Sequence, residues 1–287
     1  MVSAAMKQLI RIVACVAAAV SLQAAASEGA RLQAAPINGQ DLASLQNGAK
    51  LFVNYCLNCH TAGYMRYNRL RDLGLTDTQI KDNLIFTGVK VGELMQVAMG
   101  RKDAKEWFGV APPDLTVTAR SRSSSAGTGA DWIYSYLRSF YRDPSRPTGW
   151  NNLVFPNVGM PHVLWQLNGQ AELKEEVFEN EHAAHAALVA TRGVAQLEEM
   201  HQMKDGVLHE RYVLKTIVPG KGSLSSLEYD KSVADLANYM NYMAEPARLE
   251  RRTIGFYVLM VLGLLLVLVY ALKKSYWKDL QIGRAHV

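Results

Sequence analysis

Two long apolar runs enclose the central part of the chain. The first, Ile12 to Leu22, follows Lys7 and Arg11 and ends on small residues at positions 24–26. This order is typical of a secretory signal peptide, so we expect residues 1–26 to be a signal peptide cleaved after Ala26. An uncleaved anchor would need a longer run, and a lipoprotein cleaved before Cys15 would leave only a few apolar residues ahead of that cysteine.

The second run, Thr253 to Leu272, contains no charged residue and is bracketed by Arg251, Arg252, Lys273 and Lys274. Its length fits one transmembrane helix, whereas a buried core helix would carry a polar face. The flanking charges balance, so the signal peptide sets the orientation. We expect residues 27–247 in the periplasm, residues 253–272 in a bacterial inner membrane as its single pass, and residues 273–287 as a cytoplasmic tail.

The end of that tail does not resemble native sequence. Its last six residues, Ile282 to Val287, match the translation of a common sequencing-library adapter. We therefore treat residues 282–287 as non-native and leave them out of the expectations for the fold.

Between the apolar runs, the pattern mainly indicates helices. Apolar side chains recur at helical spacing from Leu42 to Cys56, directly after the capping residue Asp41. Ser225 and Glu228 form a capping box ahead of a helix that continues from Leu227. The stretch at about 168–222 is rich in Ala, Glu and His, and we expect it to be an insertion.

The net charge of +5 changes this picture little, because the excess lies at the ends of the chain. Residues 27–247 carry 22 basic and 24 acidic residues. A mildly acidic central domain does not present a basic nucleic-acid surface, so we expect no nucleic-acid partner.

The candidate chemistry lies in the pentapeptide Cys56-Leu57-Asn58-Cys59-His60. Removal of the signal peptide removes Cys15, which leaves Cys56 and Cys59 as the only cysteines of the exported domain. Two cysteines three positions apart and followed by histidine form the attachment motif of c-type haem. The thiols add to the haem vinyl groups, and His60 is delivered to the iron as its proximal ligand.

Other uses of these cysteines remain open but fit less well. A thioredoxin-like pair normally opens a helix after a strand, whereas this motif closes a helix. A zinc site needs two more ligands, for which His182 and His185 are the paired candidates. A disulfide would leave His60 unexplained.

A methionine is the expected distal ligand in an electron carrier. Met160 lies between Gly159 and Pro161 in the segment Phe155 to His162, called here the Met160 loop, which can bring a side chain to a flat ring. Met95 and Met99, four residues apart, indicate one face of a core helix. From the residues alone, Met160 is favoured, and Met95, Met99 and His162 remain alternatives.

Several further motifs, in this order along the chain, resemble the cytochrome c1 family. The resemblance runs from about Gln40 to Trp277 and is much more specific than the haem motif alone. Its segments are Cys56 to His60, Met65 to Tyr67, Ala111 to Leu115, Ala119 to Arg122, Asp131 to Tyr134, Pro147 to Gly149, the Met160 loop, Tyr229 to Pro246 and the terminal anchor.

The resemblance implies a mainly α fold, with a class I cytochrome c-like haem domain that carries insertions and one C-terminal transmembrane helix. It implies one covalently attached haem c, with Met160 as the axial methionine. Pro112 and Pro113 would line the haem edge, and Arg120 would meet a haem propionate, a role for which a planar guanidinium is suited. Arg122 is a close competitor of Arg120.

By the same resemblance, the protein takes single electrons from a Rieske iron–sulfur protein and passes them to soluble cytochrome c, beside cytochrome b in a quinol-oxidising complex. As a redox subunit it would need no acid, base or nucleophile of its own. One alternative is a stand-alone membrane-anchored cytochrome that feeds a terminal oxidase. Another is a haem-based sensor, which would need a vacant sixth position.

The expected insertion begins with an acidic stretch, Glu172 to Glu181, in which Lys174 is the only positive charge. One interpretation is a solvated helix face. The other is a docking surface for a basic cytochrome c, whose association rate opposite charge would increase. Metal binding by the histidines of the insertion is the weaker hypothesis, since no cysteine accompanies them. They are His182, His185, His201 and His209.

Overall fold

The computed structural model describes residues 30–204 and 207–284. The expected signal peptide, residues 1–26, lies outside the described part of the chain. About 48% of the described residues are helical. The helices are α2 (Leu42–Leu51), the π-helix η1 (Phe52–Cys56), the 3₁₀ helix η2 (Tyr67–Leu73), α3 (Asp77–Leu84), α4 (Arg101–Phe108), α5 (Thr118–Ser121), α6 (Gly129–Leu137), α7 (Trp165–Asn168), α8 (Glu181–Ala190), α9 (Ser226–Ala244) and α10 (Arg248–Arg284).

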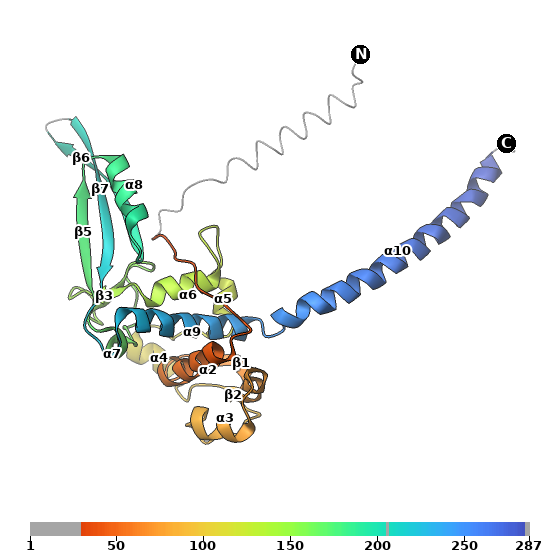
Figure 1. Ribbon diagram of the computed structural model, residues 1–287, viewed down its shortest axis with the longest axis horizontal. Coiled ribbons are helices and arrows are strands. Elements are labelled where there is room, and N and C mark those ends of the chain that lie inside the picture. The colour runs from red at the N-terminus through yellow and green to blue at the C-terminus, as the bar shows by residue number, and fades with distance from the viewer. Residues whose placement is uncertain (1–29, 205–206, 285–287) are drawn as a thin grey trace, which may run out of the picture.

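The strands form three small antiparallel sheets: β1 with β2, β3 with β4, and a three-stranded sheet in the order β5-β7-β6. They are β1 (Ala62–Arg66), β2 (Leu94–Met95), β3 (Phe140–Arg142), β4 (Trp150–Asn152), β5 (Glu172–Phe178), β6 (Ala195–Lys204) and β7 (Val207–Val218). The helical domain of Figure 1 therefore carries more strand than the sequence indicates.

The core is built where α2 crosses α9, and both helices begin as the sequence predicts. The Asp41 carboxylate caps α2, and Ser225 with Glu228 forms the capping box of α9. The helices approach so closely that a Cβ at Gly48 would lie 2.1 Å from the backbone oxygen of Asp235. One turn further along, the rings of Phe52 and Tyr239 are in contact, with centroids 5.6 Å apart.

The expected helix face around Met95 and Met99 is wrong. Leu94 and Met95 form β2, which pairs with β1, and Met99 lies in a bend. Met95 is fully buried, and the Tyr239 hydroxyl donates a hydrogen bond to its sulfur at 3.7 Å. The strand pairing of this short segment overrides the four-residue spacing of its methionines.

Residues 172–204 and 207–218 form an arm that projects from the helical core, on the side away from α10 (Figure 1). It consists of the β5-β7-β6 sheet and the helix α8, which packs on that sheet. The solvated helix face considered for the acidic stretch is wrong, because Glu172 to Phe178 is the edge strand β5. Pairing with β7 along its whole length overrides the weak helical pattern of these residues.

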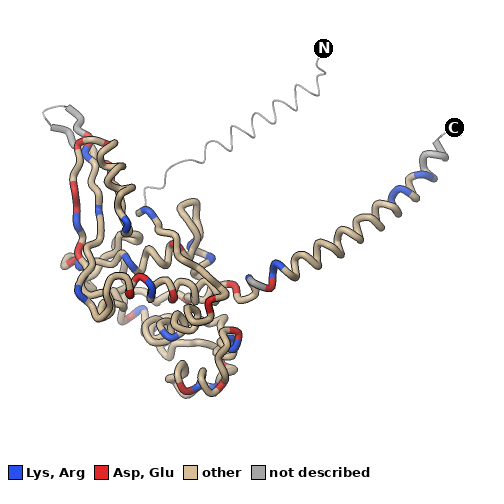
Figure 2. The backbone as a smooth tube through the Cα atoms, viewed as in Figure 1, with Lys and Arg blue, Asp and Glu red and all other residues tan. Residues whose placement is uncertain are grey.

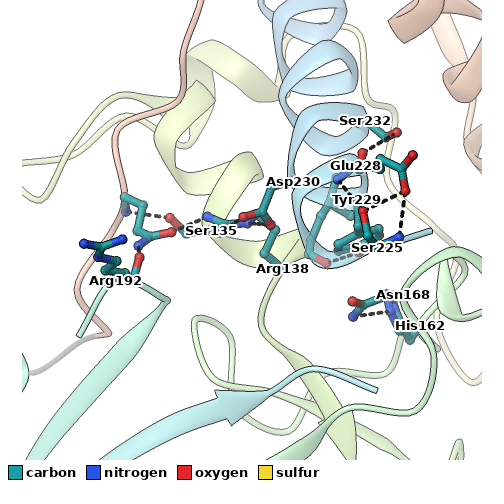
Figure 3. Close-up of polar contacts among 12 residues, drawn as sticks. Ser135, Arg138, His162, Asn168, Arg192, Ser225, Glu228, Tyr229, Asp230 and Ser232 are labelled. Atoms are coloured by element: carbon teal, nitrogen blue, oxygen red, sulfur yellow. Dashed lines mark hydrogen bonds and ion pairs between the residues drawn. The ribbon is translucent and has the colours of Figure 1, made fainter. Parts of the chain in front are cut away.

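The base of the arm is tied to the helical core by the segment that precedes α2. Gln33 donates a hydrogen bond to the carbonyl of Arg192 and accepts one from Arg138. Arg138, at the end of α6, also forms a two-point ion pair with Asp230 of α9, at 2.5 and 2.6 Å (Figure 3). One guanidinium thus joins two core helices to the strand-like segment that holds the arm.

The last helix, α10, leaves the rest of the molecule as a long rod (Figure 1). Within it, Glu250–Lys278 is the one segment of the described chain that is long and apolar enough to cross a membrane, and none of its most apolar stretch is buried against protein. Apolar side chains such as Leu259 and Leu266 are about 70% exposed. This segment contains the predicted run 253–272.

Candidate functional site: the Cys-X-X-Cys-His segment and the Met160 loop

The cysteine motif lies at the end of the α2–η1 helix, as its periodicity predicts. In η1 the Leu57 amide donates to the Phe52 carbonyl, a five-residue spacing that widens the last turn. The amides of Cys59 and His60 then both donate to the Cys56 carbonyl, which ends the helix. Cys56 and Cys59 are free thiols on one turn, with Cys56 buried and Cys59 half-buried.

His60 is fixed by a single backbone oxygen. Its Nδ1 lies 2.8 Å from the Pro113 carbonyl oxygen, which can only accept, so Nδ1 carries the proton and donates it. Nε2 is thereby left with a free lone pair, the arrangement usual for metal-ligating histidines. Burial lowers the pKa of His60, against the opposing effects of the Pro113 hydrogen bond and the Asp114 charge, and so favours the neutral ring that binds metals.

Asp114 holds the segment that supplies this oxygen. Its carboxylate accepts hydrogen bonds from the Thr61 hydroxyl at 2.9 Å, the Gly63 amide at 2.6 Å and the Thr116 amide at 2.8 Å. Burial alone would raise the pKa of Asp114, but the hydrogen bonds together lower it. The carboxylate therefore stays ionised and fastens Pro113 against the residues that follow His60.

The Met160 loop lies against the same proline segment. A Cβ at Gly159 would be 3.9 Å from a methyl carbon of Val110, three residues before Pro113. Met160 itself is half-buried, packs on the hydrophobic core, and accepts a hydrogen bond from the Tyr136 hydroxyl at its sulfur, at 3.4 Å. Pro113 thus contacts His60, and Val110, three residues earlier, borders the Met160 loop.

Two of the three other candidate ligands, His162 and Met95, lie within the core, whereas the third, Met99, is half-buried in a bend. His162 is fully buried: its ring stacks on Phe140 at 4.9 Å, and Trp150 meets it edge-on. Its Nε2 lies 3.5 Å from the Asn168 side-chain amide (Figure 3). Met95 is enclosed under α9, as described above. Both are surrounded by core side chains, while Met160 lies at the edge of the core.

Of the remaining predicted residues, Pro112 is half-buried beside Pro113, and Arg120 is exposed on α5. Within residues 30–204 and 207–284, Arg120 takes part in no ion pair. The competing Arg122 places its guanidinium 4.5 Å from the centre of the Trp132 ring and 5.5 Å from that of Phe155. That stacking occupies Arg122 and leaves Arg120 as the freer guanidinium.

The protonation of Cys56 bears on the alternative chemistries. Burial, with a smaller effect from Cys59, raises the pKa of the Cys56 thiol to about 12. A redox-active cysteine pair needs a lowered thiol pKa, and a zinc site needs thiolates. A neutral Cys56 thiol beside the His60 imidazole instead suits covalent attachment of haem c.

Three residues that hold this site escape the sequence analysis: Asp114, Tyr136 and Asn152. Asp114 lies inside a motif already recognised, and its position directly after two prolines was the available signal. Tyr136 reads as one more aromatic residue of an amphipathic helix. The partners of Asn152 lie in α6 and in the Met160 loop, so no local pattern marks it.

The described part of the arm carries exposed acidic and histidine side chains. Glu199, His201 and Glu210, all exposed, have ligand atoms within 4.8 Å of one another on neighbouring strands. Exposed groups commonly come this close without a metal. On β5, Lys174 pairs with Glu176, and Lys215 lies between Glu175 and Glu198.

A Cys-X-X-Cys-His turn in a helical core, followed by one long apolar helix, defines a membrane-anchored c-type cytochrome. A model of the cytochrome c1 family matches residues 33–106 and 225–280. The cytochrome c1 of Allochromatium vinosum is 45% identical, over 89% of this chain and 92% of the relative. The chain belongs to the cytochrome c1 family, whose members carry a covalently attached haem c.

Two further relatives show the range of the similarity. A protein of Nitrosomonas europaea named as an ammonia monooxygenase gamma subunit is 44% identical, over 87% of this chain and 89% of that protein. The cytochrome c1 of Rhodospirillum rubrum is 26% identical, over 84% and 83%. Both comparisons cover most of each chain, beyond the two segments that the family model matches.

Proposed function

We propose that this protein is the haem-bearing subunit that passes single electrons from a Rieske iron–sulfur protein to soluble cytochrome c, beside cytochrome b in a quinol-oxidising complex. Family membership supports a redox role of the bc1 type. The observation that carries the assignment of the site is the His60–Pro113 hydrogen bond. It leaves Nε2 of a neutral imidazole free, directly after two free cysteines.

In this proposal each residue has a separate task. Cys56 and Cys59 would hold the haem through thioether links, and His60 Nε2 and Met160 Sδ would bind its iron. Pro112 and Pro113 line the haem edge, while Arg120 meets a propionate. Haem c supplies the one-electron chemistry when bound. The protein sets its exposure and potential, and quinol oxidation takes place in a neighbouring subunit.

The proposed topology follows from the two apolar runs. Residues 1–26 direct export and are removed, the haem domain lies in the periplasm, and α10 anchors it in the bacterial inner membrane with its carboxyl end in the cytoplasm. This places the haem domain on the side where soluble electron carriers of the periplasm can reach it.

The test is purification from membranes in mild detergent, followed by identification of the subunits and a haem spectrum. We expect cytochrome b and a Rieske protein to co-purify with a low-spin, methionine-ligated c-type haem. Isolation alone or with a terminal oxidase would favour the stand-alone cytochrome, and a vacant sixth position would favour a sensor. Co-purification with monooxygenase subunits would instead support the role named for the Nitrosomonas relative.

A further inference from the structure

The Met160 sulfur accepts a hydrogen bond from a buried and well-packed side chain, Tyr136. The Tyr136 hydroxyl donates to Met160 Sδ at 3.4 Å, and Tyr136 is only 9% exposed. Its ring is held on two sides, stacked on Trp132 at 4.7 Å and 12°, and edge-on to Phe140 at 5.0 Å. Because the ring lies between Trp132, one turn earlier in α6, and Phe140 of β3, the hydroxyl can point in few other directions.

The backbone of the same tyrosine fixes the loop that carries Met160. The Tyr136 carbonyl accepts from the Asn152 side-chain amide at 2.8 Å. Asn152 is fully buried, and its side-chain oxygen accepts from the amides of Val154 and Phe155, each at 3.0 Å. Through Asn152, the Tyr136 carbonyl thus holds the start of the Met160 loop, and the Tyr136 hydroxyl holds the Met160 sulfur.

The stretch just before Met160 is also held by side-chain hydrogen bonds. Asn157 is the one residue other than glycine with a positive φ in the described chain, at 62°. Its amide donates to the Asn151 side-chain oxygen at 2.8 Å, and its carbonyl accepts from Arg146 at 2.9 Å. A left-handed residue held by two side chains fixes the direction in which the chain enters Gly159 and Met160.

We propose that Tyr136 is the positioning residue of the sixth ligand: its hydroxyl takes up one lone pair of Met160 Sδ and directs the other toward the iron, and its carbonyl anchors the Met160 loop through Asn152. This inference rests on the proposed axial role of Met160. A donor on a thioether also withdraws electron density from the sulfur, which favours ferrous over ferric iron. Tyr136 therefore raises the reduction potential as well as holding the ligand.

Tyr136→Phe in the full-length, haem-loaded protein is the direct test, because it keeps the ring and the carbonyl and removes only the donor. We expect a lower midpoint potential and a weaker thioether-to-iron absorption band. We also expect carbon monoxide to bind the reduced protein roughly five- to tenfold faster, the factor that corresponds to one neutral hydrogen bond. Tyr134→Phe is the matched control: it removes the same hydroxyl from the same helix, at a ring that faces Arg138 at 4.4 Å.

A double-variant cycle with Met160→Leu separates this inference from the proposed function. If Met160→Leu keeps the absorption band, Met160 is not the ligand and the proposed site is wrong. If that variant loses the band but Tyr136→Phe behaves like Tyr134→Phe, the site stands and the positioning role is overturned. A potential shift by Tyr136→Phe that is equally large in the Met160→Leu background would also overturn it, since the hydroxyl would then not act through the sulfur.

Discussion

At the scale of single residues, the site contains side chains that make a hydrogen bond and still keep a lone pair free. His60 donates through Nδ1 to Pro113 and keeps Nε2, and the Met160 sulfur accepts from Tyr136 with a second lone pair to spare. Cys56 and Cys59 are free thiols on one helical turn. This arrangement fits the proposed ligand roles of His60 and Met160, because each side chain is held by a partner and keeps a lone pair free.

Replacement of both Cys56 and Cys59 by serine should remove both thioether links. A covalent-haem stain on a denaturing gel should then be lost, and the mature protein should accumulate poorly because the haem is a large part of the core. Cys15→Ser makes the same chemical change in the expected signal peptide and should leave the stain intact. Equal staining of the double variant and the unchanged protein would contradict covalent attachment at these residues.

Asp114→Asn should lower the free energy of unfolding by about 1–2 kcal/mol near neutral pH, because charge-assisted hydrogen bonds become neutral ones. The pKa of Asp114 is lowered in the folded state. Its contribution is therefore complete above the unfolded carboxyl pKa of about 3.9 and is lost as the pH falls through the lower folded value.

Urea unfolding of the detergent-solubilised protein at several pH values measures this difference. The gap between Asp114→Asn and the unchanged protein should close in acid. Asp82→Asn, on the exposed side of α3, should show no such gap at neutral pH. A gap of constant size down to strongly acidic pH would show that the Asp114 charge is not what holds the proline segment.

At the scale of elements, the decisive contact is the crossing of α2 and α9, because α2 carries the cysteine motif at its end. Gly48 allows the crossing, and Phe52 packs on Tyr239 immediately before η1 begins. The position of Cys56 is thus set by a helix whose other end is capped and whose middle is fixed against α9.

Gly48→Ala tests the crossing. Alanine favours an isolated helix by about 1 kcal/mol over glycine, but a Cβ would lie 2.1 Å from the Asp235 carbonyl oxygen and 2.6 Å from the Tyr239 Cβ. Overpacking costs about 1–3 kcal/mol, so the clash should win and the urea midpoint should fall. Gly92→Ala, where no atom lies within 4 Å of the added Cβ, should leave the midpoint unchanged.

The helices at both sides of the core could be predicted because their signals are local: Asp41 before an apolar period, and Ser225 three residues before Glu228. The sheet of the arm could not be predicted from local signals, because β5 is a strand through its pairing with β7, nearly forty residues later along the chain. The cysteine motif could be recognised from five adjacent residues. The hydrogen-bond partner of His60 could not be predicted. Pro113 reaches His60 because the neighbouring Asp114 accepts a hydrogen bond from Gly63, about fifty residues earlier in the chain.

At the scale of the whole molecule, a helical core lies between two projections, the arm on one side and α10 on the other (Figure 1). The arm adds exposed charge to a central domain that is slightly acidic. Acidic residues lie along β5 at the edge of the sheet, where the backbone tube of Figure 2 is red. Part of this charge is balanced locally, because Lys174 and Lys215 pair with Glu176 and Glu175.

Replacement of Glu172, Glu175, Glu176 and Glu179 by glutamine tests whether the arm attracts a basic partner. If it does, the second-order rate of electron transfer to a basic soluble cytochrome c should fall at low ionic strength and change little at high salt. The haem spectrum should stay the same. An unchanged rate at low salt would mean that the acidic edge is only solvated and that docking takes place elsewhere.

The central claim is the electron path from the Rieske protein through this subunit to soluble cytochrome c. The most direct test is to mix the purified complex rapidly with ubiquinol and to follow the absorbance of the c-type haem of this subunit. We expect the haem to be reduced by quinol only when the Rieske protein is present, and to be reoxidised on addition of oxidised soluble cytochrome c. Reduction at the same rate without the Rieske protein, or no reoxidation by cytochrome c, would contradict the proposed place of this subunit in the electron path.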